Sequence, residues 1–269
     1  MYDGFYKLAS GMLTQSRNLN VIGNNMVNVQ TPGYKQDTMV STTFQEEMLY
    51  RTGRTSKANP EPLATTSRIK AADRTYVNYE QGGFEVTDGI FDFALSGNGF
   101  FCIQTAGGER YTRNGAFAVD NEGYLELPGI GRVLSTENQP IRIESEDFSV
   151  DSRGNITVSL LRTGEEEDSY EEEQEVQQYG ALKVVDFADY NQLQREDNGI
   201  FSTGQAQLPA GLNGGETKII WQTLEKSNVN MVNEMTAMMS SQRALQGAAQ
   251  ALKMYDQIMS KSVTDIGRL

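Results

Sequence analysis

The sequence predicts an α+β protein in which helices at the two ends of the chain form a discontinuous coiled-coil stem and the centre forms a mainly antiparallel β-domain. Near both ends, apolar residues recur at alternating spacings of three and four, which is typical of helices that pack side by side. All eleven methionines lie at or before Met48 or at or after Met231, whereas nineteen of the 26 glycines lie between Gly82 and Gly215. The chain therefore combines helical ends with a turn-rich centre.

The first apolar series predicts a helix over residues 2–29. Proline cannot continue a helix and glycine permits a tight turn, so we expect the helix to stop before Pro32 and Gly33. At a rise of about 1.5 Å per residue, this helix would be about 40 Å long. Apart from the polar Gln15, the series consists of Phe5, Leu8, Met12, Leu19, Ile22, Met26 and Val29.

The next segments are less regular. Residues 37–50 carry a weaker amphipathic pattern that fits either a second helix or an extended segment. Residues 51–68 are rich in Thr, Ser, Arg and Lys and contain two prolines, which predicts an exposed linker. The expected organisation is an N-terminal stem, a linker, a β-domain, a second linker and a C-terminal stem over residues 1–50, 51–74, 75–208, 209–220 and 221–269.

In the centre, short apolar runs alternate with Gly, Asn, Asp and Pro turns, which predicts an antiparallel β-domain. The acidic stretch from Glu165 to Glu175 is expected to be a solvated loop or hairpin tip, with a cation site as the alternative. The candidate strands are residues 91–95, 100–104, 109–112, 116–119, 124–127, 132–134, 141–143, 148–150, 156–161 and 180–187.

The second apolar series predicts the C-terminal helix. Two helices offer too little surface to bury both series, so we expect other subunits to cover the rest. Methionine suits such a surface because its unbranched side chain adapts to different neighbours. Polar residues interrupt the series at Asn228, Gln242 and Asp256. Its other members include Leu224, Met231, Met235, Met238, Leu245, Leu252, Met259 and Val263.

Composition argues against most enzymes. The chain has no histidine, which removes Ser-His-Asp and Cys-His pairs and the commonest metal ligand. Gly97 and Gly99 do not begin a dinucleotide fingerprint, because Cys102 stands where the third glycine would be. We therefore expect no catalytic site, no metal and no cofactor. With a formal charge of −13, a nucleic-acid partner is not expected either. Neither a membrane span nor a cleavable secretory signal is predicted.

Three sequence motifs resemble those of the bacterial flagellar rod and hook protein family. The first runs from Asn24 to Lys35, the second begins at Ser96 and continues through Tyr111–Phe117 to Leu125, and the third is Leu224–Asn230. The chain departs from the family pattern at Met26-Val27 and Asn98, and in the acidic stretch. The residues that carry the resemblance are Asn24, Asn25, Asn28, Thr31, Gly33, Tyr34, Lys35, Gly97, Gly99, Phe100, Phe101, Asn228 and Val229.

The resemblance implies a structural subunit of the basal-body rod, located outside the cytoplasm and exported through the flagellar type III apparatus without signal cleavage. It implies self-association into a helical tube that transmits torque, with other rod and hook proteins and the export apparatus as partners. The two apolar series would then be the polymerisation interface. The chain is short for a hook protein, and a distal rod position is preferred to a proximal one. The alternatives are a coiled-coil extracellular adhesin and a carboxylate-based glycosidase.

Overall fold

The protein forms two compact units in a computed structural model. The structure describes residues 2–51, 61–143, 148–160, 175–210 and 217–266. The helical unit comprises Met1–Val27, Asp37–Asn78 and Asn230–Leu269. The β unit comprises Asn28–Gln36 and Tyr79–Val229. Of the acidic stretch 165–175, all but Glu175 lies outside the described residues.

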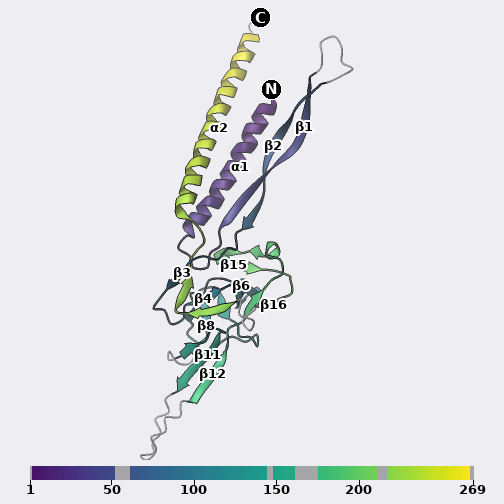
Figure 1. Ribbon diagram of the computed structural model, residues 1–269. Coiled ribbons are helices and arrows are strands. Elements are labelled where there is room, and N and C mark those ends of the chain that lie inside the picture. Colours follow the sequence, from purple (N-terminus) through teal and green to yellow (C-terminus); the bar gives the residue numbers. More distant parts are fainter. Residues whose placement is uncertain (1, 52–60, 144–147, 161–174, 211–216, 267–269) are drawn as a thin grey trace, which may run out of the picture. The chain divides into compact units, whose positions relative to one another are not determined.

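Two helices and a β-hairpin make up the helical unit (Figure 1). Helix α1 spans Tyr2–Val27 and helix α2 spans Met231–Ile266. The Asn230 side-chain oxygen accepts hydrogen bonds from the amides of Val232 (3.1 Å) and Asn233 (3.2 Å), and so caps the start of α2. The hairpin strands β1, Asp37–Arg51, and β2, Glu61–Val77, pack beside α1.

The two helices are antiparallel and meet at positions with heptad spacing. Asn25 Nδ2 donates to Glu234 Oε1 (3.3 Å), and Asn18 Nδ2 donates to Ser241 Oγ (3.1 Å). Each step of seven residues along α1 is thus matched by seven along α2. Two heptads further on, Gly4 lies opposite Tyr255. Because α1 begins at Tyr2, the last residues of α2 extend beyond it, as Figure 1 shows.

The hairpin replaces two expected features. Residues 37–50, left open between helix and extended chain, form strand β1. Much of the expected linker 51–74 is strand β2, paired with β1 from Asp37↔Val77 to Arg51↔Glu61. Non-local backbone pairing with β1 stabilises this polar sequence as a strand, which its composition alone would not indicate. Pro62 is accommodated opposite Tyr50, where the register shifts.

The β unit is built from antiparallel strands, as predicted. Its largest sheet has the order β14-β15-β6-β5-β9-β8-β7, and β13 joins β5 to β16. Smaller sheets pair β10-β11-β12, β17-β4 and β18-β3. The strands are β3 Phe84–Val86, β4 Phe93–Ser96, β5 Phe100–Thr105, β6 Gly108–Thr112, β7 Ala118–Val119, β8 Leu125–Leu127, β9 Gly131–Val133, β10 Phe148–Val150, β11 Asn155–Leu160, β12 Glu175–Ala181, β13 Val184–Asp186, β14 Gln194–Arg195, β15 Ile200–Ser202, β16 Leu208–Pro209, β17 Lys218–Trp221 and β18 Thr223–Glu225.

Two strands of the β unit lie where a linker and the C-terminal stem were expected. Strand β17 pairs with β4, and β18 pairs with β3, so residues 218–225 belong to the sheet region. In the predicted strand 141–143, only Arg142 forms an isolated bridge, to Tyr124, and the preceding Pro140 forms another, to Leu134. The sequence Lys218–Trp221 is too short for its alternation to stand out, and its pairing partner is far away in the chain.

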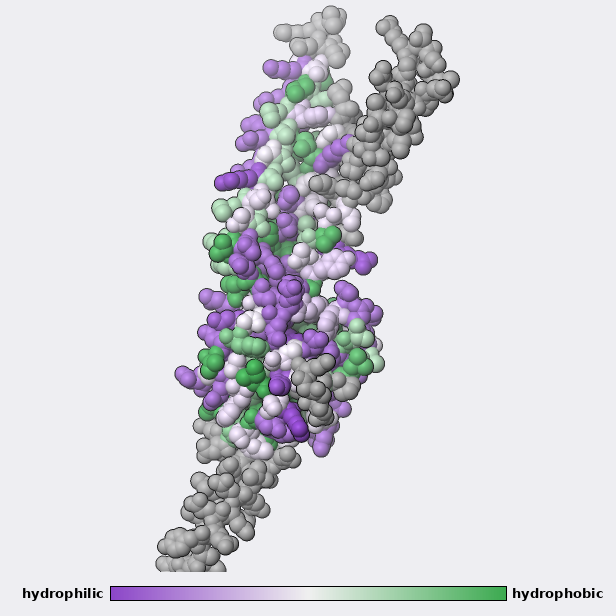
Figure 2. All heavy atoms as spheres, viewed as in Figure 1, coloured by the Kyte–Doolittle hydropathy of each residue, from purple (hydrophilic) through white to green (hydrophobic). Residues whose placement is uncertain are grey.

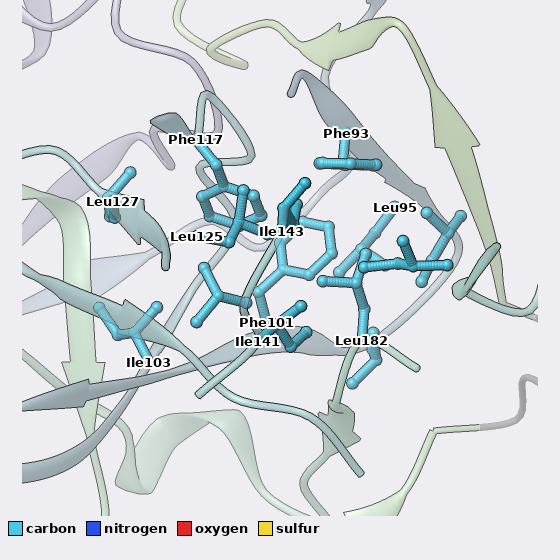
Figure 3. Close-up of a cluster of buried hydrophobic side chains, with 14 of the residues drawn as sticks. Phe93, Leu95, Phe101, Ile103, Phe117, Leu125, Leu127, Ile141, Ile143 and Leu182 are labelled. Carbon is cyan, nitrogen blue, oxygen red and sulfur yellow. The ribbon is translucent and has the colours of Figure 1, made fainter. Parts of the chain in front are cut away.

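The core of the β unit is aliphatic and aromatic (Figure 3). Phe93 and Leu95 of β4, together with Phe101 and Ile103 of β5, are fully buried there. Cys102 is buried as well, and burial raises the pKa of its thiol. This cysteine is therefore an inert hydrophobic residue, as its apolar neighbours predict.

Candidate functional site

The three signature motifs of the sequence meet in the β unit. Residues 28–36 run beside the end of β18, where the Gly33 amide donates to the Glu225 carbonyl oxygen (2.7 Å). The Gln36 amide donates to the Asn228 side-chain oxygen (2.7 Å). Gly33 has φ +68°, and a Cβ atom there would lie 2.3 Å from the carbonyl carbon of Arg113. The close approach of these segments requires glycine at this position.

At this junction, Lys35, Arg113 and Glu225 form a buried ionic cluster. Lys35 Nζ lies 2.7 Å from Glu225 Oε1, and Arg113 Nη1 lies 3.4 Å from Oε2 of the same carboxylate. All three side chains are at most 5% exposed. Two cations therefore share one anion. Each of the three charged residues comes from a different signature motif.

Backbone groups stabilise the excess positive charge of the ionic cluster. Lys35 Nζ donates to the Glu80 carbonyl oxygen (2.8 Å), and Arg113 Nη2 donates to that of Gly97 (2.8 Å). The pKa of Lys35 lies below its usual value, chiefly because the side chain is buried. The Glu225 carboxylate raises this pKa and the nearby Arg113 lowers it, but burial has the largest influence. Removing the shared carboxylate of Glu225 would leave two buried cations without a counterion, which is strongly destabilising.

Aromatic side chains surround the ionic cluster. The Arg195 guanidinium carbon lies 4.0 Å from the centroid of the Tyr34 ring, and Arg195 Nη1 donates to the Lys35 carbonyl oxygen (2.9 Å). The Arg113 guanidinium carbon lies 5.3 Å from the centroid of Phe100. These cation–π contacts place Tyr34 and Phe100, both signature residues, against the charges.

The structure thus brings together signature residues that are far apart in sequence. Gly33, Tyr34, Lys35, Gly97 and Phe100 join Asn228 around Glu225, whereas Phe101 lies in the core and Val229 is buried nearby. Gly99 adopts φ +119° beside Val184. The Asn28 side chain accepts from the Thr31 hydroxyl (3.2 Å) in the turn that follows α1.

Sequence reasoning missed three partners in this cluster. Arg113 and Glu225 stand inside the quoted motifs but were not singled out, and Arg195 lies outside them. The sequence signal for a buried charge was a charged residue next to an apolar strand residue, as at Glu225 after Leu224. Sequence alone does not indicate that Lys35 and Glu225, separated by 190 residues, are paired.

Asn25 holds a second junction, inside the helical unit. Its Nδ2 donates to the Asp37 carbonyl oxygen (2.8 Å) as well as to Glu234, and its Oδ1 accepts from the Asp37 amide (2.9 Å). It therefore links α1 to β1 and to the first turn of α2. The adjacent signature residue Asn24 is exposed.

The predicted apolar series divides between two faces of the helices. On α2, Glu234, Ser241 and Tyr255 lie at the contact with α1, each one position before a member of the predicted heptad pattern. The polar pairs thus shift the contact with α1 by one position along α2. A pattern of apolar residues alone does not reveal this shift. Met231, Met235 and Val263 are consequently exposed. The buried or half-buried members are Phe5, Leu8, Met12, Leu19, Ile22, Met26, Met238, Leu245, Leu252 and Met259.

Val29 and Leu224, the two remaining members, lie in the β unit. Both line a surface groove of about 390 Å³ beside Pro32, with the Glu85–Lys226 ion pair (3.1 Å) at its edge. The groove was not anticipated, because both residues were assigned to the helical stripes.

Many apolar side chains are exposed on the helical unit, and Figure 2 shows them among polar ones. On α2 the most exposed are Val232 (70%), Val263 (68%) and Ile258 (63%). No helix among the described residues is long and apolar enough to cross a membrane. The described part of the chain also contains no cluster of three or more Cys, Asp or Glu residues suited to a metal ion.

Three family models match the chain, at both ends and in the middle. Residues 5–35 match the flagella basal body rod protein, residues 94–158 the flagellar hook protein FlgE/F/G D1 domain, and residues 222–265 the flagellar basal body rod FlgEFG protein C-terminal region. These matches contain the motifs that meet in the ionic cluster.

Relatives match over nearly the full length. The flagellar basal-body rod protein FlgG of Buchnera aphidicola subsp. Schizaphis graminum is 27% identical, over 94% of this chain and 95% of its own. The flagellar hook-basal body complex protein FlhO of Bacillus subtilis is 27% identical and the rod protein FlgF of Caulobacter vibrioides 28%, each over 100% of both chains. These comparisons support neither an adhesin nor a glycosidase. The chain belongs to the flagellar basal-body rod protein family and is a structural subunit of the rod, not an enzyme.

Proposed function

We propose that this subunit polymerises into a helical tube through its terminal helices and so transmits torque along the rod. The observation that carries the proposal is the apolar outer face of α2, where Val232, Met235 and Met239 are about half exposed or more. An exposed apolar face of this kind marks a protein–protein interface. Contacts between unlike faces of successive copies produce an open helical polymer instead of a closed ring.

The antiparallel contact between α1 and α2 supports the further proposal that the pair acts as a coiled coil. Its heptad-spaced pairs, Asn25 with Glu234 and Asn18 with Ser241, fix the register of the two helices. A stem of fixed register offers neighbouring copies a reproducible surface. The proposal also includes export through the flagellar type III apparatus, a position outside the cytoplasm, and contacts with other rod and hook proteins.

Outward-facing substitutions on α2 test self-assembly without disturbing the fold. Val232→Asp and Met239→Asp place charges on exposed positions, so the helical unit should fold normally while assembly is lost. Ser240→Asp, also exposed, is the matched control. The measurements are sedimentation of concentrated purified protein and swimming motility. Wild-type sedimentation by Val232→Asp would contradict the assignment of this face to assembly.

Leu19 and Leu245 are less suitable positions for this test. Both are half-buried on helices that contact each other, so Asp at either position would disturb the packing of the helical unit itself. Loss of assembly in such a variant would not separate folding from polymerisation. Val232 and Met239 avoid this ambiguity.

A further inference from the structure

We propose that the groove of the β unit receives the C-terminal end of α2 from a second copy of the chain. The groove is the surface lined by Val29, Pro32 and Leu224, with Gln30, Glu85 and Lys226 at its edge. The α2 tip is residues 258–266. This inference rests on the proposed self-assembly and specifies one of its contacts.

The α2 tip has an apolar face that α1 does not cover. Tyr255 lies opposite Gly4, so the residues after 257 extend past the first residue of α1, by about 14 Å at 1.5 Å per residue. The face that packs on α1 continues into this overhang through Met259. Ile258, three residues after Tyr255, lies beside Met259 on this face and is exposed. No described residue of α1 lies opposite this part of α2, so the face is available to a second copy of the chain.

The groove offers the complementary chemistry. Its lining includes three apolar side chains, and its volume of about 390 Å³ provides room for the apolar residues of one helix turn. Asp88 is exposed on the segment that follows β3, and Glu85 of β3 is paired with Lys226 at the groove edge. Within the α2 tip, Lys261 is exposed, and the sequence also places Asp265 there.

The charges of the two units also favour this occupant. The β unit contains 11 Lys and Arg against 27 Asp and Glu, a net charge of −16. The helical unit contains 12 against 9, a net charge of +3. A helical unit is thus attracted to the β unit of another copy, whereas two β units repel each other.

Cysteine cross-linking tests the contact directly. One copy carries Gln30→Cys at the groove edge, and a second, tagged copy carries Ser262→Cys on the α2 tip. The native Cys102 is buried and does not react. Each copy has one reactive thiol, so a mixed disulfide can form only between two chains. We expect the tagged and untagged chains to form a mixed dimer at concentrations where the wild type sediments.

Two variants and a control position make the test specific. Adding Ile258→Asp to the Ser262→Cys copy should reduce the mixed dimer at least tenfold, since it charges the docking face. Gln257→Asp adds the same charge on the neighbouring outer position and should leave the yield unchanged. Ser240→Cys, exposed at the other end of α2, should not cross-link to Gln30→Cys.

Three results would overturn the inference: no mixed dimer, an equal yield with Ser240→Cys, or an equal yield after Ile258→Asp. Sedimentation of the wild-type protein is measured separately and decides the proposed self-assembly. Wild-type polymer without the mixed dimer would leave self-assembly standing and reject the groove as the docking site.

Discussion

The helical unit and the β unit differ in what their buried polar groups do. In the β unit, a carboxylate and two cations are buried at the point where both connecting segments meet the sheets. In the helical unit, the buried polar residues include Asn25 and Glu234, which are joined by a hydrogen bond, and several apolar side chains of α2 are exposed. The β unit thus buries charged groups at its own junction, whereas the helical unit buries uncharged and acidic groups and exposes apolar side chains along α2. In the proposed assembly, these exposed side chains are the ones that a neighbouring copy would cover.

The largest effect is expected from the shared anion of the ionic cluster. Glu225→Gln leaves Lys35 and Arg113 buried without a counterion, and should destabilise the β unit by about 3–5 kcal/mol. Lys35→Met leaves a balanced pair of Arg113 and Glu225, so its effect should be clearly smaller. Urea unfolding followed by the fluorescence of Trp221, the single tryptophan, measures both variants. Equal destabilisation would mean that the two cations do not share the charge of Glu225.

The corresponding prediction for the helical unit is smaller. Asn25→Ala removes the hydrogen bonds to Glu234 of α2 and to the backbone of Asp37 in β1. Because these polar groups lose a partner, the free energy of unfolding should fall by about 1–3 kcal/mol. Asn20→Ala, at an exposed position of α1, is the control and should have little effect. Circular dichroism at the helix band during urea unfolding reports the change. A loss no larger than that of the control would show that Asn25 does not hold this junction.

Local patterns in the sequence predicted much of both units, but not their pairing. The end of α1 before Pro32 and most strands of the β unit follow from turn residues and apolar runs. Strand β2 could not be predicted, because its stability as a strand depends on pairing with β1. Likewise, Lys35, Arg113 and Glu225 each belong to a recognisable motif, yet nothing local shows that one carboxylate serves both cations. The contact face of α2 could not be predicted either, because its buried polar residues Glu234 and Ser241 find their partners on α1, far away in the chain.

The salt dependence of the contact between copies tests which charged surfaces come together. If a positive helical unit contacts a negative β unit of another copy, raising NaCl should weaken the contact by screening the attraction. The yield of the Gln30→Cys and Ser262→Cys mixed dimer should therefore fall severalfold between low and high salt. An increase in yield would indicate that repulsion between β units dominates, and would contradict the charge argument for the groove.

The smallest expected effect is a pH dependence confined to the β unit. Burial alone raises the pKa of Glu109, but hydrogen bonds from Lys183 and Gln207 and the charge of Lys183 outweigh it, so the pKa lies below its usual value. Lys183 Nζ lies 2.6 Å from Glu109 Oε1. A carboxyl group with a lowered pKa in the folded state binds its proton more readily when unfolded. Its stabilising contribution is therefore present above the unfolded pKa and is lost as the pH falls through the folded pKa.

Glu109→Gln should remove this contribution and nothing else that titrates in acid. We expect the variant to be slightly less stable than the wild type near neutral pH, with the difference shrinking as the pH falls below the ordinary range of a glutamate. Trp221 fluorescence in urea at a series of pH values measures it. Glu137→Gln, at an exposed position, is the matched control and should not change the pH profile. A difference between Glu109→Gln and wild type that stays constant into acid would show that the Glu109–Lys183 pair acts through packing and not through charge.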